Sequence, residues 1–71
     1  MKKLQLLYIG RDNWSRPVYE ANGHLYVDTE PRKGYGPHIC TKLNDDFCGE
    51  PDTPISDDIE IEFIPCRDIW E

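Results

Sequence analysis

Hydrophobic residues fall into short runs separated by polar turn formers along this chain, a pattern typical of β-strands rather than long helices. Two such runs, residues 18–21 and 24–29, are separated by Asn22 and Gly23. An Asn-Gly pair readily supplies the two positive-φ positions of a type I′ turn, which joins adjacent antiparallel strands. The sequence therefore predicts a β-hairpin whose two-residue loop fixes its register.

The predicted register pairs Val18 with Val27, Tyr19 with Tyr26, Glu20 with Leu25 and Ala21 with His24. Side chains alternate between the two faces of a strand. Val18, Leu25 and Val27 are therefore expected on the core face of the hairpin. Tyr19 and Tyr26 are expected to form an aromatic pair on the opposite face, which is either partly wet or covered by another part of the chain.

Two further runs predict strands outside the hairpin. Residues 4–9 are apolar except for Gln5, which suits a strand covered on both faces. Residues 59–65 alternate cleanly, with Ile59, Ile61 and Phe63 at the inward positions. We expect these two strands to complete the sheet, either by pairing with each other or by packing across a small barrel.

Residues 30–58 lack strand periodicity and contain most of the glycines and prolines, so a long irregular loop is expected there. A short helical turn over residues 41–47 fits the pattern, with Thr41 as N-cap and Leu43 and Phe47 on one side. The predicted fold is mainly β. One domain over residues 1–71 contains a small antiparallel sheet of about four strands, a meander followed by a C-terminal strand.

Composition limits the classes of partner. The chain has 71 residues and a net charge of −6 at pH 7. Residues 1–35 contain six Lys or Arg and four acidic residues, whereas residues 36–71 contain two and ten. A field of this sign repels phosphate backbones, so direct nucleic-acid binding is not expected. No apolar run approaches the ~20 residues of a membrane span, and no signal-peptide pattern surrounds residues 4–9. We therefore expect a cytoplasmic protein without membrane contact.

Three cysteines and one nearby histidine could supply a zinc site. His38, Cys40, Cys48 and Cys66 are in principle a Cys3His ligand set. Structural zinc ligands usually come in close pairs, and only His38 and Cys40 are close in this sequence. We therefore expect free thiols and no cofactor, with a zinc-stabilised module as the least favoured alternative.

Catalysis is not expected from this chain. His38 and Cys40 share a face of an extended segment, but the sequence indicates no oxyanion hole and no concave pocket. Aromatic residues in turns are more informative, because aromatic rings beside arginines are favoured at protein interfaces. The candidate binding residues are Arg11, Trp14, Arg16, Arg32 and Tyr35.

Three segments of the chain resemble a known group of proteins: residues 8–19 (YIGRDNWSRPVY), 22–28 (NGHLYVD) and 47–55 (FCGEPDTPI). The group consists of small uncharacterised Firmicutes proteins, often encoded on conjugative transposons, and is similar to a large polyvalent-protein-associated domain. The resemblance implies an accessory or interaction module of a mobile element. It brings no catalytic residue to this chain.

Two functions follow as hypotheses. The first is a non-enzymatic module that binds an unknown protein partner through the turn and loop that contain Trp14 and Tyr35. The second is an acidic mimic of nucleic acid that inhibits a basic DNA-binding protein. Its charge would come from four aspartates of the second half: Asp45, Asp46, Asp57 and Asp58.

Overall fold

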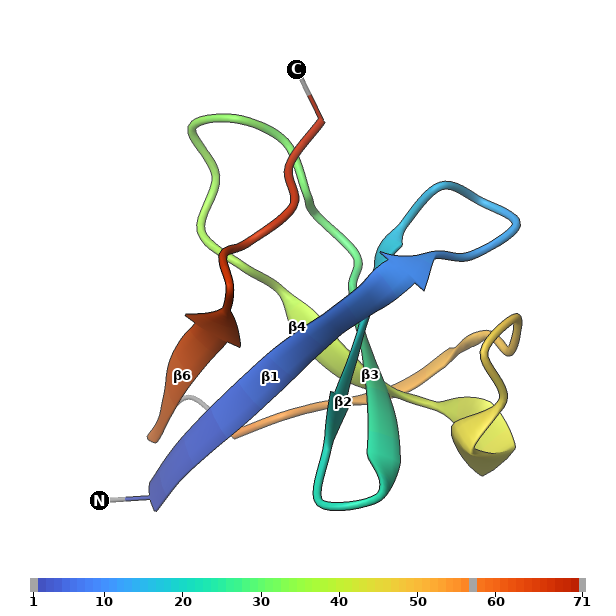
Figure 1. The fold of residues 1–71 in the computed structure, drawn as a ribbon, viewed down its shortest axis with the longest axis horizontal. Helices are drawn as coiled ribbons and strands as arrows, with labels where there is room; N and C mark the ends of the chain where they lie inside the picture. Colours follow the sequence, from blue (N-terminus) through green and yellow to red (C-terminus); the bar gives the residue numbers. More distant parts are fainter. Residues whose placement is uncertain (1, 57, 71) are drawn as a thin grey trace.

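The computed structural model describes residues 2–56 and 58–70, and a single curved sheet carries most of this part of the chain (Figure 1). Its strands are β1 (Lys2–Arg11), β2 (Pro17–Ala21), β3 (His24–Asp28), β4 (Ile39–Lys42), β5 (Pro51–Pro54) and β6 (Ile59–Ile64). A turn of 3-10 helix, η1 (Leu43–Asp45), follows β4. The prediction of a mainly β fold is confirmed. In the described residues no helix is long and apolar enough to cross a membrane.

The strands lie in the order β5-β4-β3-β2-β1-β6. The pairings from β1 to β5 are antiparallel, but β6 pairs with β1 in parallel. The predicted antiparallel sheet of about four strands is therefore wrong in number and in this pairing. The sequence pattern of residues 30–58 does not reveal β4 and β5. Each has only four residues, and the prolines of β5 interrupt the alternation that would identify a strand.

The hairpin prediction is confirmed in register. All four predicted pairs between β2 and β3 are present. Asn22 has a φ of 54° and Gly23 a φ of 80°, the positive values that a type I′ turn requires. Local turn chemistry is therefore sufficient to define this part of the sheet.

A β-bulge near the end of β1 bends the sheet. The register between β1 and β2 shifts between Tyr8 and Gly10, and Gly10 has a φ of 141°, which L side chains rarely adopt. The Phe47 ring lies close by, at a distance that a Cβ would meet in ordinary van der Waals contact. The positive φ, rather than a lack of space, therefore requires glycine at this bend of β1.

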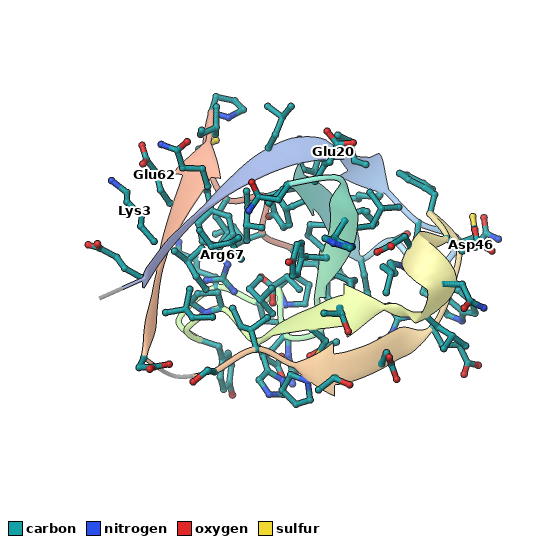
Figure 2. All side chains as sticks on the ribbon, turned by 90° about the horizontal axis from the view of Figure 1, so that it is seen from below. Lys3, Glu20, Asp46, Glu62 and Arg67 are labelled. Atoms are coloured by element: carbon teal, nitrogen blue, oxygen red, sulfur yellow. The ribbon has the colours of Figure 1, made fainter. Side chains whose placement is uncertain are left out.

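The inner face of the curved sheet encloses the main core. Its buried residues are Leu4, Leu6, Tyr19, Ala21 and Ile39. The predicted inward residues of the last strand, Ile59, Ile61 and Phe63, pack against this cluster. Figure 2 shows the strands curving around these interior side chains.

Of the two expectations for the tyrosine face, partly wet or covered, the structure shows the covered one. Tyr19 is fully buried and Tyr26 is half-buried against the core. The Tyr19 ring lies 5.7 Å from the Tyr8 ring and 5.1 Å from the Phe63 ring, between centroids. The curvature of the sheet makes the tyrosine face concave, and the alternation within one hairpin carries no information about curvature.

A second, smaller cluster of buried residues lies on the opposite face of the sheet. Val18, Val27 and Cys40 are neighbours across β2, β3 and β4 and are buried there. The short helical turn predicted over residues 41–47 is present as η1, but it is shorter than predicted, and Thr41 belongs to β4 instead of capping it. Asn44 and Asp45 have φ values of 56° and 51°, which end the helical geometry at once.

Candidate functional site

A buried aspartate fixes the turn between β1 and β2. Asp12 Oδ1 accepts hydrogen bonds from the backbone amides of Trp14 at 2.9 Å and Arg16 at 3.0 Å. Its Oδ2 accepts from Lys42 Nζ at 2.6 Å, and both side chains are 0% exposed. Burial alone would raise the pKa of Asp12, but the hydrogen bonds from Lys42 and the two amides outweigh it and lower that pKa. The turn is therefore held by an ionised carboxylate.

A second buried aspartate fixes the loop between β3 and β4. Asp28 Oδ1 accepts from the amides of Glu30 at 3.0 Å and His38 at 3.2 Å. Its Oδ2 accepts from Arg67 Nε at 2.9 Å. The guanidinium also donates to the carbonyls of Glu30 and Tyr35, each at 2.8 Å. Figure 2 shows Arg67 directed into the interior, unlike the other labelled residues.

The segment after β6 is attached to the sheet through Asp68. Asp68 accepts from Tyr8 Oη at 2.7 Å and from Arg11 Nε and Nη2 at 2.7 and 2.9 Å. Its backbone amide donates to Tyr19 Oη at 3.1 Å. The Arg11 guanidinium, beside which Asp68 lies, lowers the pKa of that carboxyl, and burial raises the pKa of Tyr19 to about 12. The Arg11 side chain is thus paired with Asp68 of the segment after β6, residues 65–70, which we call the tail.

Trp70 connects the two loops. Its amide donates to the Pro31 carbonyl at 2.6 Å, and Trp70 forms an isolated bridge with Arg32. Its indole Nε1 donates to the Ser15 carbonyl at 2.8 Å. The sequence includes Trp70 as one more aromatic residue, but its role depends on contacts with residues some 40 and 55 positions away, which no local pattern reveals.

Two arginine–aromatic pairs lie on these connected loops. The Arg16 guanidinium lies 4.9 Å from the Trp14 ring, and that of Arg32 lies 5.2 Å from the Tyr35 ring. Trp14 is 51% exposed and Tyr35 is 55% exposed. We call the set Trp14, Arg16, Arg32, Tyr35 and Trp70 the aromatic surface. Four of the five predicted binding residues belong to it, whereas Arg11, at the end of β1, is paired with Asp68 of the tail.

Most of the positive charge at this surface is balanced. Arg16 Nε lies 3.6 Å from Asp12 Oδ2, and Arg32 Nε lies 2.5 Å from Glu30 Oε1. Arg16 Nε is also buried without a hydrogen-bond partner among residues 2–56 and 58–70. The aromatic rings, more than net charge, therefore distinguish this surface.

The candidate zinc ligands do not come together. Cys40 is buried in β4, whereas Cys48 and Cys66 are exposed. His38 is exposed, and its Nδ1 lies 2.8 Å from Thr29 Oγ1. In the described part of the chain no three His, Cys, Asp or Glu side chains are grouped so that they could hold a metal ion. Burial raises the pKa of the Cys40 thiol, which disfavours the thiolate that a nucleophile or ligand requires.

The acidic candidates are spread over several sites. Asp45 Oδ1 accepts from the Leu25 amide at 3.1 Å, and its Oδ2 lies 3.1 Å from His24 Nδ1. The Leu25 amide, and then His24, lower the pKa of Asp45. Asp46 accepts from the Cys48 amide at 3.2 Å. Asp58 is exposed, and Asp57 lies outside the described residues.

Comparisons of the chain with protein families, with curated proteins and with solved structures found no match.

Proposed function

We propose that this protein is a non-enzymatic accessory module that binds another protein through the aromatic surface. The observation that carries the proposal is the exposure of Trp14 and Tyr35, at 51% and 55%, on loops fixed by buried aspartates. Aromatic and arginine side chains supply much of the binding energy at protein interfaces. Because these loops are ordered before binding, association costs less conformational entropy.

The context of a mobile element is part of the same proposal. What supports it is the resemblance of residues 8–19, 22–28 and 47–55 to small uncharacterised Firmicutes proteins that are often encoded on conjugative transposons. Residues 12–16, which present Trp14, lie within the first of these segments. An acidic mimic of nucleic acid ranks lower, because Asp45 already binds the Leu25 amide and His24.

The test compares partner binding by two alanine variants that each remove one exposed hydrophobic side chain. Partners are identified by cross-linking and affinity capture with the wild-type protein, and their affinities are then measured with purified components. Trp14→Ala is expected to weaken binding by about tenfold or more. Leu43→Ala is the matched control, because Leu43 is 48% exposed but lies in η1, outside the aromatic surface.

Equal affinity of wild type and Trp14→Ala for every purified partner would refute the proposal. Salt dependence separates the two candidate functions. Binding through the aromatic surface is expected to change less with salt than binding through the acidic residues, because its exposed contacts are mainly aromatic and Arg32 is paired with Glu30. Binding that falls steeply with salt, and is lost when Asp45 and Asp46 are both changed to Asn, would instead favour the acidic mimic.

A further inference from the structure

The two edges of the sheet differ in their ability to accept another strand. β5 begins and ends with proline, at Pro51 and Pro54, and proline has no N–H to donate to a neighbouring strand. β6 contains no proline over Ile59–Ile64 and pairs with β1 at six consecutive positions. In the described chain no strand pairs with the other side of β6, which lies at the edge of the sheet beside β1 (Figure 1).

A hollow lies directly inside this free edge. Ile59 and Ile61 of β6 line it together with Ile39, Pro54 and Ile55, while His38 and Ser56 give its wall a polar part. Its volume is about 190 Å³, and a cavity of roughly 150 Å³ is enough to hold benzene. The inward side chains of a strand added to β6 would therefore find room for an aliphatic group between β6 and the β4–β5 edge.

The outer face of β6 is acidic, in contrast to its apolar inner face. Glu60 and Glu62 point outward and are exposed, and Asp58 precedes the strand. Lys3 Nζ lies 3.1 Å from Glu62 Oε1, whereas no salt bridge involves Glu60 in residues 2–56 and 58–70. Figure 2 shows Lys3 and Glu62 together at the periphery. Opposite charges across neighbouring strands stabilise a sheet, so this edge favours a strand with outward lysines or arginines.

A second copy of this chain fits the edge poorly. Antiparallel pairing of two β6 edges must keep inward residues on one face. The central registers then set Glu62 opposite Glu60, Glu62 or Asp58 of the copy. Like charges at directly opposed positions are destabilising, so the charge pattern selects a different partner.

We propose that the free edge of β6 binds an extended segment of a basic protein, which adds to the sheet as a further strand. Its alternate aliphatic side chains enter the hollow beside Ile59 and Ile61. Its intervening lysines or arginines lie next to Glu60 and Glu62. Main-chain hydrogen bonds provide affinity and the alternation provides specificity, as in other strand additions. This site is separate from the aromatic surface and goes beyond the function proposed for it.

A synthetic peptide of alternating valine and lysine, with blocked ends, tests the proposal by NMR titration of the labelled protein. We expect changes in the chemical shifts of residues 59–64 and slower hydrogen exchange of the backbone amides in β6. A peptide with the same composition but paired residues, Val-Val-Lys-Lys, controls for charge alone. A peptide N-methylated at alternate positions on the side that pairs with β6 is expected not to bind, because it lacks those N–H donors.

Two variants with the same charge change locate the site. Replacing Glu60 and Glu62 by Gln is expected to weaken the affinity for the alternating peptide by about three- to tenfold. The matched control replaces Glu50 and Asp52, beside and within β5, by Gln and Asn and is expected to leave the affinity unchanged. Trp14→Ala is also expected to have no effect, which separates this site from the proposed function.

Three outcomes would overturn the inference. One is equal binding of the alternating and paired peptides, and another is equal binding of the N-methylated peptide; either would show only charge attraction. The third is concentration-dependent broadening of β6 signals without peptide, which would show that a second copy occupies the edge.

Discussion

The two buried aspartates fix neighbouring loops in different ways. Asp12 pairs with Lys42, which is part of the sheet, and neither side chain is exposed to water. Asp28 pairs with Arg67, which follows the last strand and is 18% exposed. The turn after β1 is therefore fixed from within the sheet, whereas the loop after β3 depends in part on Arg67, which lies after the last strand.

This difference determines how the aromatic surface depends on the rest of the fold. Trp14 and Arg16 lie on the turn held from within the sheet. Arg32 and Tyr35 lie on the loop whose carbonyls accept hydrogen bonds from Arg67. Small domains bury little apolar surface, and here buried ion pairs order the segments that the small core does not reach. Substitutions at the two pairs should therefore have separable effects.

The largest effect is expected at the fully buried pair. Lys42→Met removes the close partner of the Asp12 carboxylate and leaves only Arg16 Nε at 3.6 Å, and breaking a buried ion pair from one side costs about 3–5 kcal/mol. Urea unfolding followed by circular dichroism measures the loss. Lys33→Met is the control, because Lys33 is exposed and its loss should change stability by less than about 0.5 kcal/mol.

A double variant sharpens this prediction. Asp12→Asn combined with Lys42→Met removes the uncompensated charge, while the amide oxygen of asparagine still accepts from the backbone of the turn. It is expected to be more stable than Lys42→Met alone. Equal stability of wild type and Lys42→Met would show that the pair does not hold the turn.

A smaller and more local effect is expected at Arg67. Arg67→Met removes the partner of Asp28 and the donors to two carbonyls, at a cost of about 2–3 kcal/mol. The cost is lower than at Lys42 because Arg67 is partly exposed and water can reach Asp28 after the substitution. Amide exchange should accelerate at Glu30 and His38 but not at Trp14 and Arg16.

Arg32→Met is the matched control, because Arg32 pairs with Glu30 at the exposed surface. It should leave the amides of Glu30 and His38 protected. Uniform acceleration at both loops in Arg67→Met would contradict the separation of the two ion pairs.

The sequence predicts the parts of this molecule that depend on local chemistry. Asn22 and Gly23 define a hairpin because the turn needs only two positive-φ residues, and the alternation around Ile61 defines β6. The parallel pairing of β6 with β1 is not visible, because alternation shows which face is buried but not the direction of the neighbour.

For the candidate site too, the sequence predicts the residues of the turns but not the tertiary contacts that hold them. Trp14, Arg16, Arg32 and Tyr35 are identifiable as turn aromatics beside arginines. The pairing of Asp12 with Lys42, 30 residues apart, and of Asp28 with Arg67, 39 residues apart, depends on tertiary contacts. Lys42 in particular resembles any surface lysine in the sequence, so the contact that holds the turn was missed.

The smallest effect tests the attachment of the tail itself. Tyr8→Phe removes the hydrogen bond that Tyr8 Oη donates to Asp68, which is expected to cost about 1 kcal/mol. The pKa of Asp68 is lowered in the folded protein, first by Arg11, so its ionised form stabilises the fold above its ordinary pKa. That contribution is lost as the pH falls through the lowered value.

The difference in stability between wild type and Tyr8→Phe should therefore be constant near neutral pH and decrease in acid, because the bond loses its charged acceptor. Urea unfolding of both proteins at several pH values measures this difference. Tyr26→Phe is the control, because Tyr26 is also a half-buried tyrosine and its hydroxyl makes no side-chain hydrogen bond within residues 2–56 and 58–70. Equal stability of wild type and Tyr8→Phe near neutral pH would show that Tyr8 acts by packing alone, and a difference that persists unchanged in acid would show that its hydroxyl contributes without the charge of Asp68.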